Sequence, residues 1–492
     1  MEKHVLSKST FVNGCQCPKR LYLGKYNRGL RNPQDERQQA IFNSGTSIGE
    51  LAQQLFKGGV DASPPDSYSY QLAVKKTAAF IAQGETIIYE AAFQFDGVLC
   101  AVDILVKKGN HWYAFEVKST LSAKVQHVQD AALQYYVLTL VGLNLKDISI
   151  IHLNRDYVRK GALDIDQLFA TESVLEGVLN QQEFIKHKID ELKTVLANKE
   201  EPTMDIGEHC YTPYGCDFTD HCWSQIPKED SIFELARGPV WKLYEAGYKH
   251  LDDIPEDFTL SEKVGMQLRH YKSGEVFIDQ SAISDFIKPL SYPLYFLDFE
   301  TIMPGVPEFD GQTPYQQIPF QFSLHIQQKE NGSLEHVYFL GDGKADPRKG
   351  LIDKMVNHLG TSGTILCYNM GFEKSRIKEL ALGNPQFEKE LLALNDRIVD
   401  LMIPFQHRWY YHPSFKGSYS IKKVLPVLIP KLRYDSLPIN EGGMASLVYV
   451  QLKWQDLETQ ESQREQLLAY CELDTFAMVE ILNFLKQITD QG

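Results

Sequence analysis

Two carboxylates and a lysine occur close together in the segment YAFEVKS and the run before it. Glu116 and Lys118 are two residues apart, so a strand would place both on one face. Asp103 lies in the preceding run, VLCAVDILV, and pairing the two runs as a hairpin would bring it beside Glu116. Two carboxylates would bind Mg²⁺ or Mn²⁺, while the lysine places or polarises an attacking water. The alternative is a surface cross-strand pair, but ionised groups inside apolar runs are costly unless they bind something.

A second acidic set is spread over the C-terminal half. Asp298 and Glu300 are two apart in YFLDFETI, and Tyr470 and Asp474 are four apart in a predicted helix. Glu373 lies in the first turn of a helix that follows a predicted strand. Carboxylates converging on a sheet hold two divalent metals about 4 Å apart for in-line attack on a phosphodiester. The pair in YFLDFETI alone is a common strand-end pair; the whole set in this order favours a site where Tyr470 orients water.

Asp400, in RIVDLM, is a further candidate for a supporting acid. The block HPSFKGSYSIKKVLPVLIPKLRYDSL (412–437) interleaves cations with aromatic rings. Such a pattern is typical of a sequence-tolerant groove for a single strand, and equally of an amphipathic helix with a solvated lysine face. The residues concerned are Phe415, Lys416, Tyr419, Lys422, Lys423, Lys431, Arg433 and Tyr434.

Three cysteines recur six residues apart in HCYTPYGCDFTDHCW: Cys210, Cys216 and Cys222. Eight cysteines in 492 residues do not make a disulfide scaffold, so the cluster predicts a metal site. The spacing is wider than that of the usual zinc knuckle, although zinc remains an alternative. Even spacing disfavours buried thiols without a ligand. Cys100, Cys367 and Cys471 lie in apolar stretches and are interpreted as core residues.

Composition limits the classes of protein. With 492 residues the chain is too long for one core, and we expect two α/β modules, 1–225 and 290–492, joined by a helical region at 226–289. The net charge of −14 argues against a protein coated in positive charge, yet allows a nucleic-acid enzyme with its cations in one cleft. No apolar run is long enough for a bilayer, and the N-terminus lacks the apolar core of a signal peptide. We therefore expect a cytoplasmic protein with no membrane partner.

The N-terminal pattern resembles the PD-(D/E)XK nucleases of the RecB-like class. It has the order Asp103, then Glu116-x-Lys118, then a helix carrying Gln134. The resemblance implies a restriction-endonuclease-like fold, a Mg²⁺ or Mn²⁺ ion on the two acids, and a catalytic part for Lys118 and Gln134. Gly49 occupies the position where the class often has a histidine or glutamate ligand.

The opening LSKSTFVNGCQCPKRLYL resembles the iron–sulfur members of that class, which include the AddB helicase–nuclease and the CRISPR-adaptation exonucleases. In these, one early cysteine joins three late ones around a [4Fe–4S] cluster, and four thiolates are the usual complement. The resemblance implies Cys17 as the early ligand, with Cys15 as its competitor, and Cys210, Cys216 and Cys222 as the late ones.

The C-terminal pattern resembles the DnaQ-like 3′–5′ exonucleases of the RNase H-like fold. Tyr470-x3-Asp474 matches their tyrosine subtype, and Glu373 stands where aspartate is usual. Taken together, the order resembles a family that joins a RecB-like iron–sulfur nuclease domain to a DnaQ-like domain catalogued as of unknown function. The resemblance covers about residues 5–225 and 290–488.

The first hypothesis is a metal-dependent nuclease, most simply an exonuclease acting on DNA, with two candidate sites. It would act in DNA repair or in defence against invading DNA. The second hypothesis is a binding module with one or both sites degenerate, which guides nucleic acid to a partner such as a helicase or a defence-system protein. The third is a structural zinc protein without nuclease activity. The sequence does not distinguish DNA from RNA.

Overall fold

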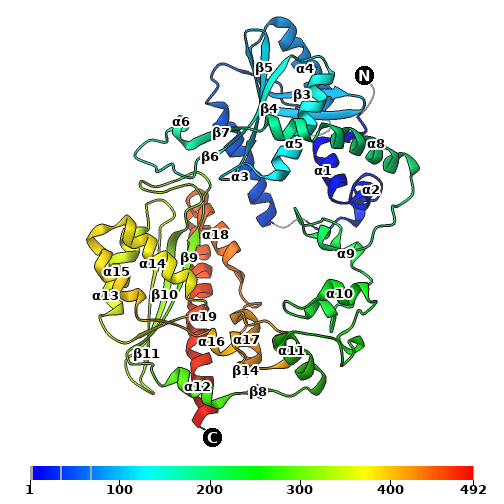
Figure 1. Cartoon of the computed structure of the whole chain (residues 1–492). Coiled ribbons are helices and arrows are strands. Elements are labelled where there is room, and N and C mark those ends of the chain that lie inside the picture. The colour runs from blue at the N-terminus through cyan, green and yellow to red at the C-terminus, as the bar shows by residue number, and fades with distance from the viewer. Residues whose placement is uncertain (1–3, 34–35, 67–68, 491–492) are drawn as a thin grey trace. The chain divides into compact units, whose positions relative to one another are not determined.

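The computed structural model describes residues 4–33, 36–66 and 69–490, with all side chains among them except those of 36–44. The chain divides into two compact units, each combining a β-sheet with helices, so the protein is of the mixed α/β class (Figure 1). The N-terminal unit contains Met1–Gln225 and Pro304–Gln316; the C-terminal unit contains Ile226–Met303 and Gln317–Gly492. The helical region expected at 226–289 thus clusters with the C-terminal unit rather than by itself.

The segment Pro304–Gln316 belongs to the N-terminal unit although it lies inside the predicted C-terminal module. Its contacts explain this. The Tyr315 hydroxyl donates to the carbonyl of Ser119 at 2.5 Å, and the Arg159 guanidinium donates to the carbonyl of Pro307 at 2.7 Å. The backbone N–H of Arg159 also donates to the carbonyl of Gln312. The expected boundary at residue 290 therefore assigns Pro304–Gln316 to the wrong unit.

The sheet of the N-terminal unit has the order β2-β3-β4-β5-β6-β7, with β1 beside β4. The predicted hairpin is confirmed: β4 and β5 pair antiparallel with Ile104 opposite Phe115, and β6 then adds parallel to β5. The strands are β1 (Leu6–Ser7), β2 (Val60–Asp61), β3 (Ile87–Phe95), β4 (Val98–Lys108), β5 (His111–Lys118), β6 (Leu145–Leu153) and β7 (Phe169–Ser173).

One helix, α5, covers this sheet with an almost wholly buried apolar face that includes Ala131, Leu133 and Leu138. Two short helices, α1 and α2, follow β1 directly; the side chain of Ser7 caps α1, and Pro18 begins α2. The helices of this unit are α1 (Lys8–Gln16), α2 (Pro18–Tyr26), α3 (Glu36–Gln53), α4 (Tyr70–Gln83), α5 (Val125–Leu140), α6 (Ile165–Leu168), α7 (Leu175–Asn180), α8 (Gln182–Asn198) and α9 (Thr219–Cys222).

The sheet of the C-terminal unit has the order β11-β10-β9-β12-β13, and β9 is its central strand. β10 runs antiparallel to β9 with Ser323 opposite Asp298, and β12 runs parallel to β9. The strands are β9 (Leu294–Ile302), β10 (Ile318–Gln327), β11 (Leu334–Leu340), β12 (Thr364–Cys367) and β13 (Ile398–Asp400); β8 (Phe277–Ile278) and β14 (Tyr410–Tyr411) pair separately.

The long helix α19 packs on β9 and β10, and the Gln321 side chain donates to the carbonyl of Leu467 in it. None of the helices in the described part of the chain combines the length and apolarity of a membrane span. The helices of this unit are α10 (Val240–Glu245), α11 (Glu262–Ser273), α12 (Gln280–Ile287), α13 (Arg348–Leu359), α14 (Gly371–Gly383), α15 (Glu388–Asn395), α16 (Ile403–Gln406), α17 (Ile421–Leu428), α18 (Gly442–Gln451) and α19 (Leu457–Asp490).

Candidate functional site

Three carboxylates converge between the central strand of the C-terminal sheet and helix α19. One oxygen each of Asp298, Glu300 and Asp474 lies within 4.8 Å of the others. Alternation along β9 points Asp298 and Glu300 to the face that α19 covers, and α19 supplies Asp474. Oxygen atoms at this spacing suit a hard divalent cation, which carboxylates bind readily. The structure thus brings together three residues that the sequence separates by 176 positions.

Burial and mutual repulsion make this cluster a poor place for unpaired negative charge. Burial, followed by the charges of Asp474 and Glu300, raises the pKa of Asp298 well above its ordinary value. Burial and the charge of Asp474 raise the pKa of Glu300 to about 8. Burial also raises the pKa of Asp474 to about 6, although the Tyr434 hydroxyl and the Lys422 amine oppose the shift. A bound cation would offset this repulsion.

Glu373 lies in the first turn of α14, as predicted, and is 2% exposed. Among the described residues, no donor lies within hydrogen-bonding distance of its Oε2 atom. Burial, with a smaller contribution from the charges of Asp400 and Asp474, raises its pKa to about 8. Its charge in turn contributes to the raised pKa of Asp298. A buried carboxylate oxygen without a donor fits a fourth acid beside a cation.

Asp400, the candidate supporting acid, binds backbone groups and does not join the acidic cluster. At the end of β13 its carboxylate accepts three backbone N–H groups, from Asn369 at 2.9 Å, Met370 at 3.2 Å and Met402 at 3.0 Å. These bonds fix the turn before α14, where Asn369 has a φ of 75°. Asp400 therefore positions the turn that carries Glu373, and its oxygens are already used.

Two residues that sequence analysis did not assign to this site complete its wall. The Tyr434 hydroxyl donates to Asp474 Oδ1 at 2.6 Å. The Lys422 amine lies 5.4 Å from the ring centroid of Tyr434 and 5.2 Å from that of Tyr470. Tyr470, the predicted water-orienting residue, is 4% exposed and packs edge-on against Tyr434. The only signal for Lys422 and Tyr434 was their place in a block rich in cations and aromatics.

That block is not a row of stacking rings. Phe415 is 1% exposed and Tyr434 is 6% exposed, so neither ring is available to a nucleobase. Lys416 pairs with Glu234 at 2.9 Å, and Lys422 also donates to the carbonyl of Asn440. Two of the three rings, Phe415 and Tyr434, thus pack inside the C-terminal unit, whereas Tyr419 is only half-buried. The helix Ile421–Leu428 within this block buries Val424 and Leu425, which agrees with the amphipathic-helix alternative.

The predicted residues of the N-terminal unit also meet. Glu116 is 2% exposed; its Oε1 atom accepts from Lys118 at 2.8 Å and from Lys8 at 2.7 Å, and its Oε2 atom accepts from Gln134 at 2.5 Å. Lys118 also pairs with Asp130 at 2.6 Å. Asp103 Oδ2 accepts the backbone N–H of Val117 at 2.6 Å. Lys8 and Asp130 were not predicted, and Lys8 lies 108 positions from its partner.

The pKa values of the carboxyl groups at this site are shifted in opposite directions. Burial opposes ionisation of Glu116, but Lys118 and Lys8 outweigh it and lower its pKa. Burial and the charge of Glu116 raise the pKa of Asp103 to about 6. Burial and Asp103 raise the pKa of Glu90 to about 8, and Glu90 adopts a strained φ of 52° inside β3. Glu90 is thus a third acid that sequence analysis missed, although it too lies in an apolar run, TIIYEAAFQF.

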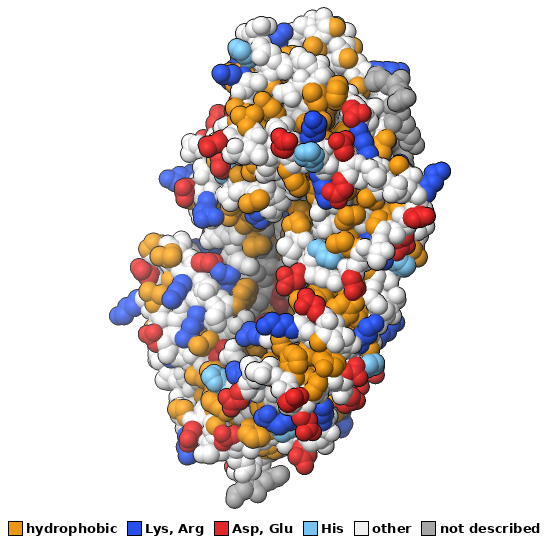
Figure 2. Space-filling view, turned by 45° about the vertical axis from the view of Figure 1, so that its right-hand side comes forward, with side chains coloured by type: hydrophobic (Ala, Val, Ile, Leu, Met, Phe, Trp, Pro, Cys, Tyr) orange, Lys and Arg blue, Asp and Glu red, His pale blue; other side chains and the backbone are white. Residues whose placement is uncertain are grey.

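A cavity of about 810 Å³ opens beside these acids, entirely within the N-terminal unit. Asp103, Glu90 and Lys8 form one part of its lining, and hydroxyl and amide side chains of α1 follow them. Four further cations line the cavity: Arg20, Lys25, Arg28 and Arg31. On the face shown in Figure 2, by contrast, acidic and basic side chains are intermixed, in keeping with the net charge of −14. Lys8 and these four cations thus line a cavity with two acids, and Asp217 pairs with Arg20 at 2.8 Å and with Arg31 at 2.7 Å.

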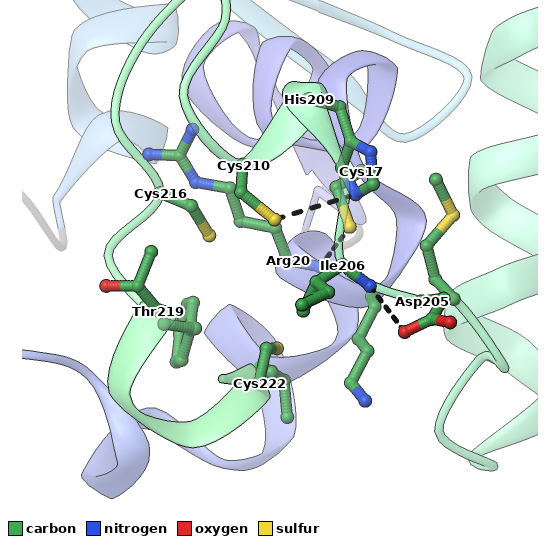
Figure 3. Close-up of a pocket in the computed structure, with 13 residues that line it drawn as sticks. Cys17, Arg20, Asp205, Ile206, His209, Cys210, Cys216, Thr219 and Cys222 are labelled. Carbon is green, nitrogen blue, oxygen red and sulfur yellow. Dashed lines mark hydrogen bonds between the residues drawn. The ribbon is translucent and has the colours of Figure 1, made fainter. Parts of the chain in front are cut away.

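The four predicted cysteines line a single pocket (Figure 3). Cys17, Cys210, Cys216 and Cys222 surround it together with Lys19 and Arg20. Cys15 does not line it and packs against the core of the N-terminal sheet, so Cys17 is the early cysteine that lies with the three late ones. The backbone N–H of Arg20 donates to Cys17 Sγ at 3.4 Å. Burial raises the pKa of Cys17, Cys222 and Cys216, the last to about 11. The other three cysteines, Cys100, Cys367 and Cys471, are buried as predicted.

A further group of potential ligands lies on the C-terminal sheet. Atoms of His325, His336 and Glu472 lie within 4.8 Å of one another. The His325 ring hydrogen-bonds the Thr475 hydroxyl at 2.8 Å, the two imidazoles stack at 4.5 Å, and the Ser323 hydroxyl joins Thr475 to His336. The hydrogen bonds within this group thus connect α19 to β10 and β11, and this structural part explains why these residues lie together.

The proteins and the family to which this chain is similar have names that state no activity. Residues 295–420 match the model of a family described as "Domain of unknown function (DUF2779)". "Uncharacterized protein UU173" of Ureaplasma parvum serovar 3 is 28% identical over 249 residues, 45% of this chain and 35% of the relative. "Uncharacterized protein MG366" of Mycoplasma genitalium is 26% identical over 253 residues, 46% of this chain and 37% of the relative. The aligned region thus spans about a third of the length of these curated relatives. The family match includes Asp298, Glu300 and Glu373 and ends before Tyr470 and Asp474.

Proposed function

We propose that the protein is a metal-dependent nuclease whose C-terminal unit is a DnaQ-like exonuclease domain of the RNase H-like fold. The observation that carries the proposal is the convergence of Asp298, Glu300 and Asp474 within 4.8 Å, at the central strand and a long C-terminal helix. Glu373 supplies the fourth acid that such a site requires. The proposed substrate is DNA, attacked at a strand end from the 3′ side.

The chemistry follows from the donor set. Bound Mg²⁺ or Mn²⁺ would activate water and stabilise charge on the phosphodiester. The chain's residues do the rest: the carboxylates hold the cations, and Tyr434 holds Asp474 in place through its 2.6 Å hydrogen bond. Tyr470 orients the attacking water, and Lys422, beside both tyrosine rings, supplies positive charge for the phosphate.

We propose a RecB-like PD-(D/E)XK fold for the N-terminal unit. The antiparallel β4–β5 hairpin, the acids Asp103 and Glu116, and Gln134 on the covering helix support it. The cavity lined by Arg20, Lys25, Arg28 and Arg31 reaches Asp103. Arg20 and Arg31 pair with Asp217, so Lys25 and Arg28 are the cations that suit the phosphates of a strand. The process served would be DNA repair or defence, with a helicase or a defence-system protein as partner.

A [4Fe–4S] cluster is the proposed ligand of the cysteine pocket. Four thiols line the pocket, which is the usual complement of a [4Fe–4S] cluster. Lys19 and Arg20 also line it, and each pairs with an acid, Glu201 and Asp217 respectively. Four thiolates on one zinc ion lie about 3.8 Å apart, given Zn–S distances of about 2.3 Å. No three of the cysteine sulfurs, all of which the structure describes, come within 4.8 Å of one another. The wider arrangement favours a cluster over zinc.

One observation favours the binding hypothesis for the N-terminal unit. Both oxygens of Glu116 are occupied by groups of the chain itself, namely Lys8, Lys118 and Gln134. A metal at Glu116 would have to displace Lys8. We therefore expect cleavage to depend on the C-terminal acids, with the N-terminal cavity holding the strand.

A cleavage time course on 5′-labelled single-stranded DNA with Mn²⁺ tests the proposal. It compares the wild type with Asp298→Ala, Glu116→Ala and, as a control, Glu335→Ala, which removes an exposed acid of β11. Loss of a 3′–5′ ladder in Asp298→Ala alone supports the proposal. Loss in Glu116→Ala alone moves the chemistry to the N-terminal unit. A wild type that cuts nothing while it binds the strand supports the binding module instead.

A further inference from the structure

A second cavity lies wholly within the C-terminal unit and has an unusual lining. Its volume is about 370 Å³, and it is formed where the start of α11 meets the end of α16 and the segment before α17. The cations Arg237, Lys263 and Arg408 line it, with His407 and Tyr419, and none of the described aspartates or glutamates does. In a chain of net charge −14, a cavity with three cations and no acid requires an explanation.

Arg408 carries the strongest part of the argument. It is 8% exposed, its guanidinium donates to the carbonyl of Lys263, and it lies 5.0 Å from the ring centroid of Tyr411. No carboxylate in the described part of the chain forms an ion pair with it. Its φ of 61° is also strained for a residue with a side chain. Burying a cation without an anion is costly, so the fold maintains Arg408 at an energetic expense.

The two other cations also lack an acidic partner among the described residues. Arg237 donates to the Tyr419 hydroxyl at 2.9 Å, and Lys263 donates to the carbonyl of Gln406 at 3.2 Å. Both side chains are exposed, so they can turn toward a ligand that enters the cavity. Carbonyl and hydroxyl oxygens orient these cations but do not neutralise them.

The cavity wall is fixed by close packing at Gly417. A Cβ added there would lie 2.3 Å from Gln267 Oε1 and 2.7 Å from the Cβ of Ala236, and the φ of Gly417 is 74°. Gln267 also accepts the backbone N–H of Ala236 at 3.1 Å. The backbone that carries Arg237 is thus held against the segment that carries Tyr419, and the cavity is formed before any ligand binds.

We propose that this cavity binds a phosphate group, with Arg408, Arg237 and Lys263 contacting its oxygens. Planar guanidinium groups bind phosphate through paired hydrogen bonds, which explains two arginines in one lining. The volume falls in the range of about 300–1,000 Å³ that is typical of ligand sites. It exceeds what a phosphate alone needs, so the ligand is a nucleotide, either free or within a strand. This inference is independent of the acidic site.

Calorimetric titration of the full chain tests it, in a phosphate-free buffer with EDTA so that no strand is cut. The probes are inorganic phosphate, a nucleoside 5′-monophosphate and a five-nucleotide single-stranded DNA. We expect Arg237→Ala and Lys263→Ala each to bind the preferred probe about tenfold more weakly, or about 1.4 kcal/mol. Arg408→Lys keeps the charge but loses the paired geometry, and should weaken binding similarly. Arg269→Ala, an exposed arginine of α11 outside the lining, is the matched control and should bind as the wild type does.

The outcomes separate the sources of the phosphate. If the DNA binds with these losses and the monophosphate does not, the ligand is a strand. If the monophosphate shows the same losses, it is a free nucleotide. Arg28→Ala removes a cation of the N-terminal cavity and measures any binding there. Equal affinities of the wild type, Arg237→Ala and Lys263→Ala for every probe would overturn the proposal, as would no binding at all. Failure of cleavage in Asp298→Ala has no bearing on either result.

Discussion

Replacing Glu300 by glutamine should stabilise the metal-free protein and remove part of its pH dependence. Glu300 is 7% exposed, and burial together with the charge of Asp474 raises its pKa from 4.5 to about 8. Between these values the folded chain binds a proton that the unfolded chain has released. Raising the pH through this window therefore removes stability, and the loss is complete above the folded pKa.

The magnitude follows from the same two values. One pKa unit corresponds to about 1.4 kcal/mol, so this single carboxyl should cost the wild type about 3 kcal/mol of unfolding free energy between about pH 5 and pH 8. Glu300→Gln has no proton to release and should show a flatter profile. Mn²⁺ should reverse the effect in the wild type, because a ligand of the folded state stabilises it.

The assay is urea unfolding across this pH range, in EDTA so that the protein is metal-free. A separate titration of the wild type with Mn²⁺ identifies the unfolding transition that the metal shifts, and the pH series follows that transition. That transition reports on the C-terminal unit. Glu335→Gln, an exposed acid on β11, is the matched control and should follow the wild type. If Glu300→Gln loses stability with pH in parallel with the wild type, the carboxyl is not under the electrostatic strain that the geometry implies, and the reasoning is refuted.

Three further changes test other parts of the molecule. Tyr434→Phe removes the 2.6 Å hydrogen bond to Asp474, so the pKa of Asp474 should rise above about 6. The pH midpoint of Mn²⁺ binding, measured by calorimetry, should then move up. An unchanged midpoint would contradict a part for Tyr434 in holding the Asp474 carboxylate. Asp400→Ala leaves three backbone N–H groups without their acceptor and should lower the unfolding free energy by about 3 kcal/mol in urea, at about 1 kcal/mol each, with Mn²⁺ stoichiometry unchanged. Cys216→Ser should abolish bound iron and visible absorbance, whereas Cys15→Ser, outside the pocket, should keep both.

Local periodicity was enough to predict the faces on which the candidate residues lie. The β4–β5 pairing and the shared helical face of Tyr470 and Asp474 both agree with the structure. These predictions depend on the direction of side chains over a few residues, which alternates along a strand and repeats about every 3.6 residues in a helix almost regardless of context.

The residues that close each site could not be predicted in the same way. Lys8 meets Glu116 across 108 positions, and Tyr434 meets Asp474 across 40. Such contacts depend on how whole elements pack, and no short pattern encodes them. Cations and aromatics in 412–437 have the same composition whether they face solvent or fill a core, so composition left a groove and an amphipathic helix equally open. The burial of Phe415 and Tyr434 decides against base stacking by these two rings.

A charge without a partner was more informative than a motif. Burial and repulsion from nearby acids raise the pKa values of Asp298, Glu300 and Glu373, so their ionised forms are costly in the metal-free fold. The buried Arg408 guanidinium forms no ion pair with a carboxylate of the described chain. Folding tolerates such costs where binding later offsets them. The acids therefore favour the binding of a cation, and Arg408 favours the binding of an anion. In the proposed nuclease, the acids would hold metal at the scissile phosphate, and the cavity lined by Arg408 would be a separate site for a phosphate.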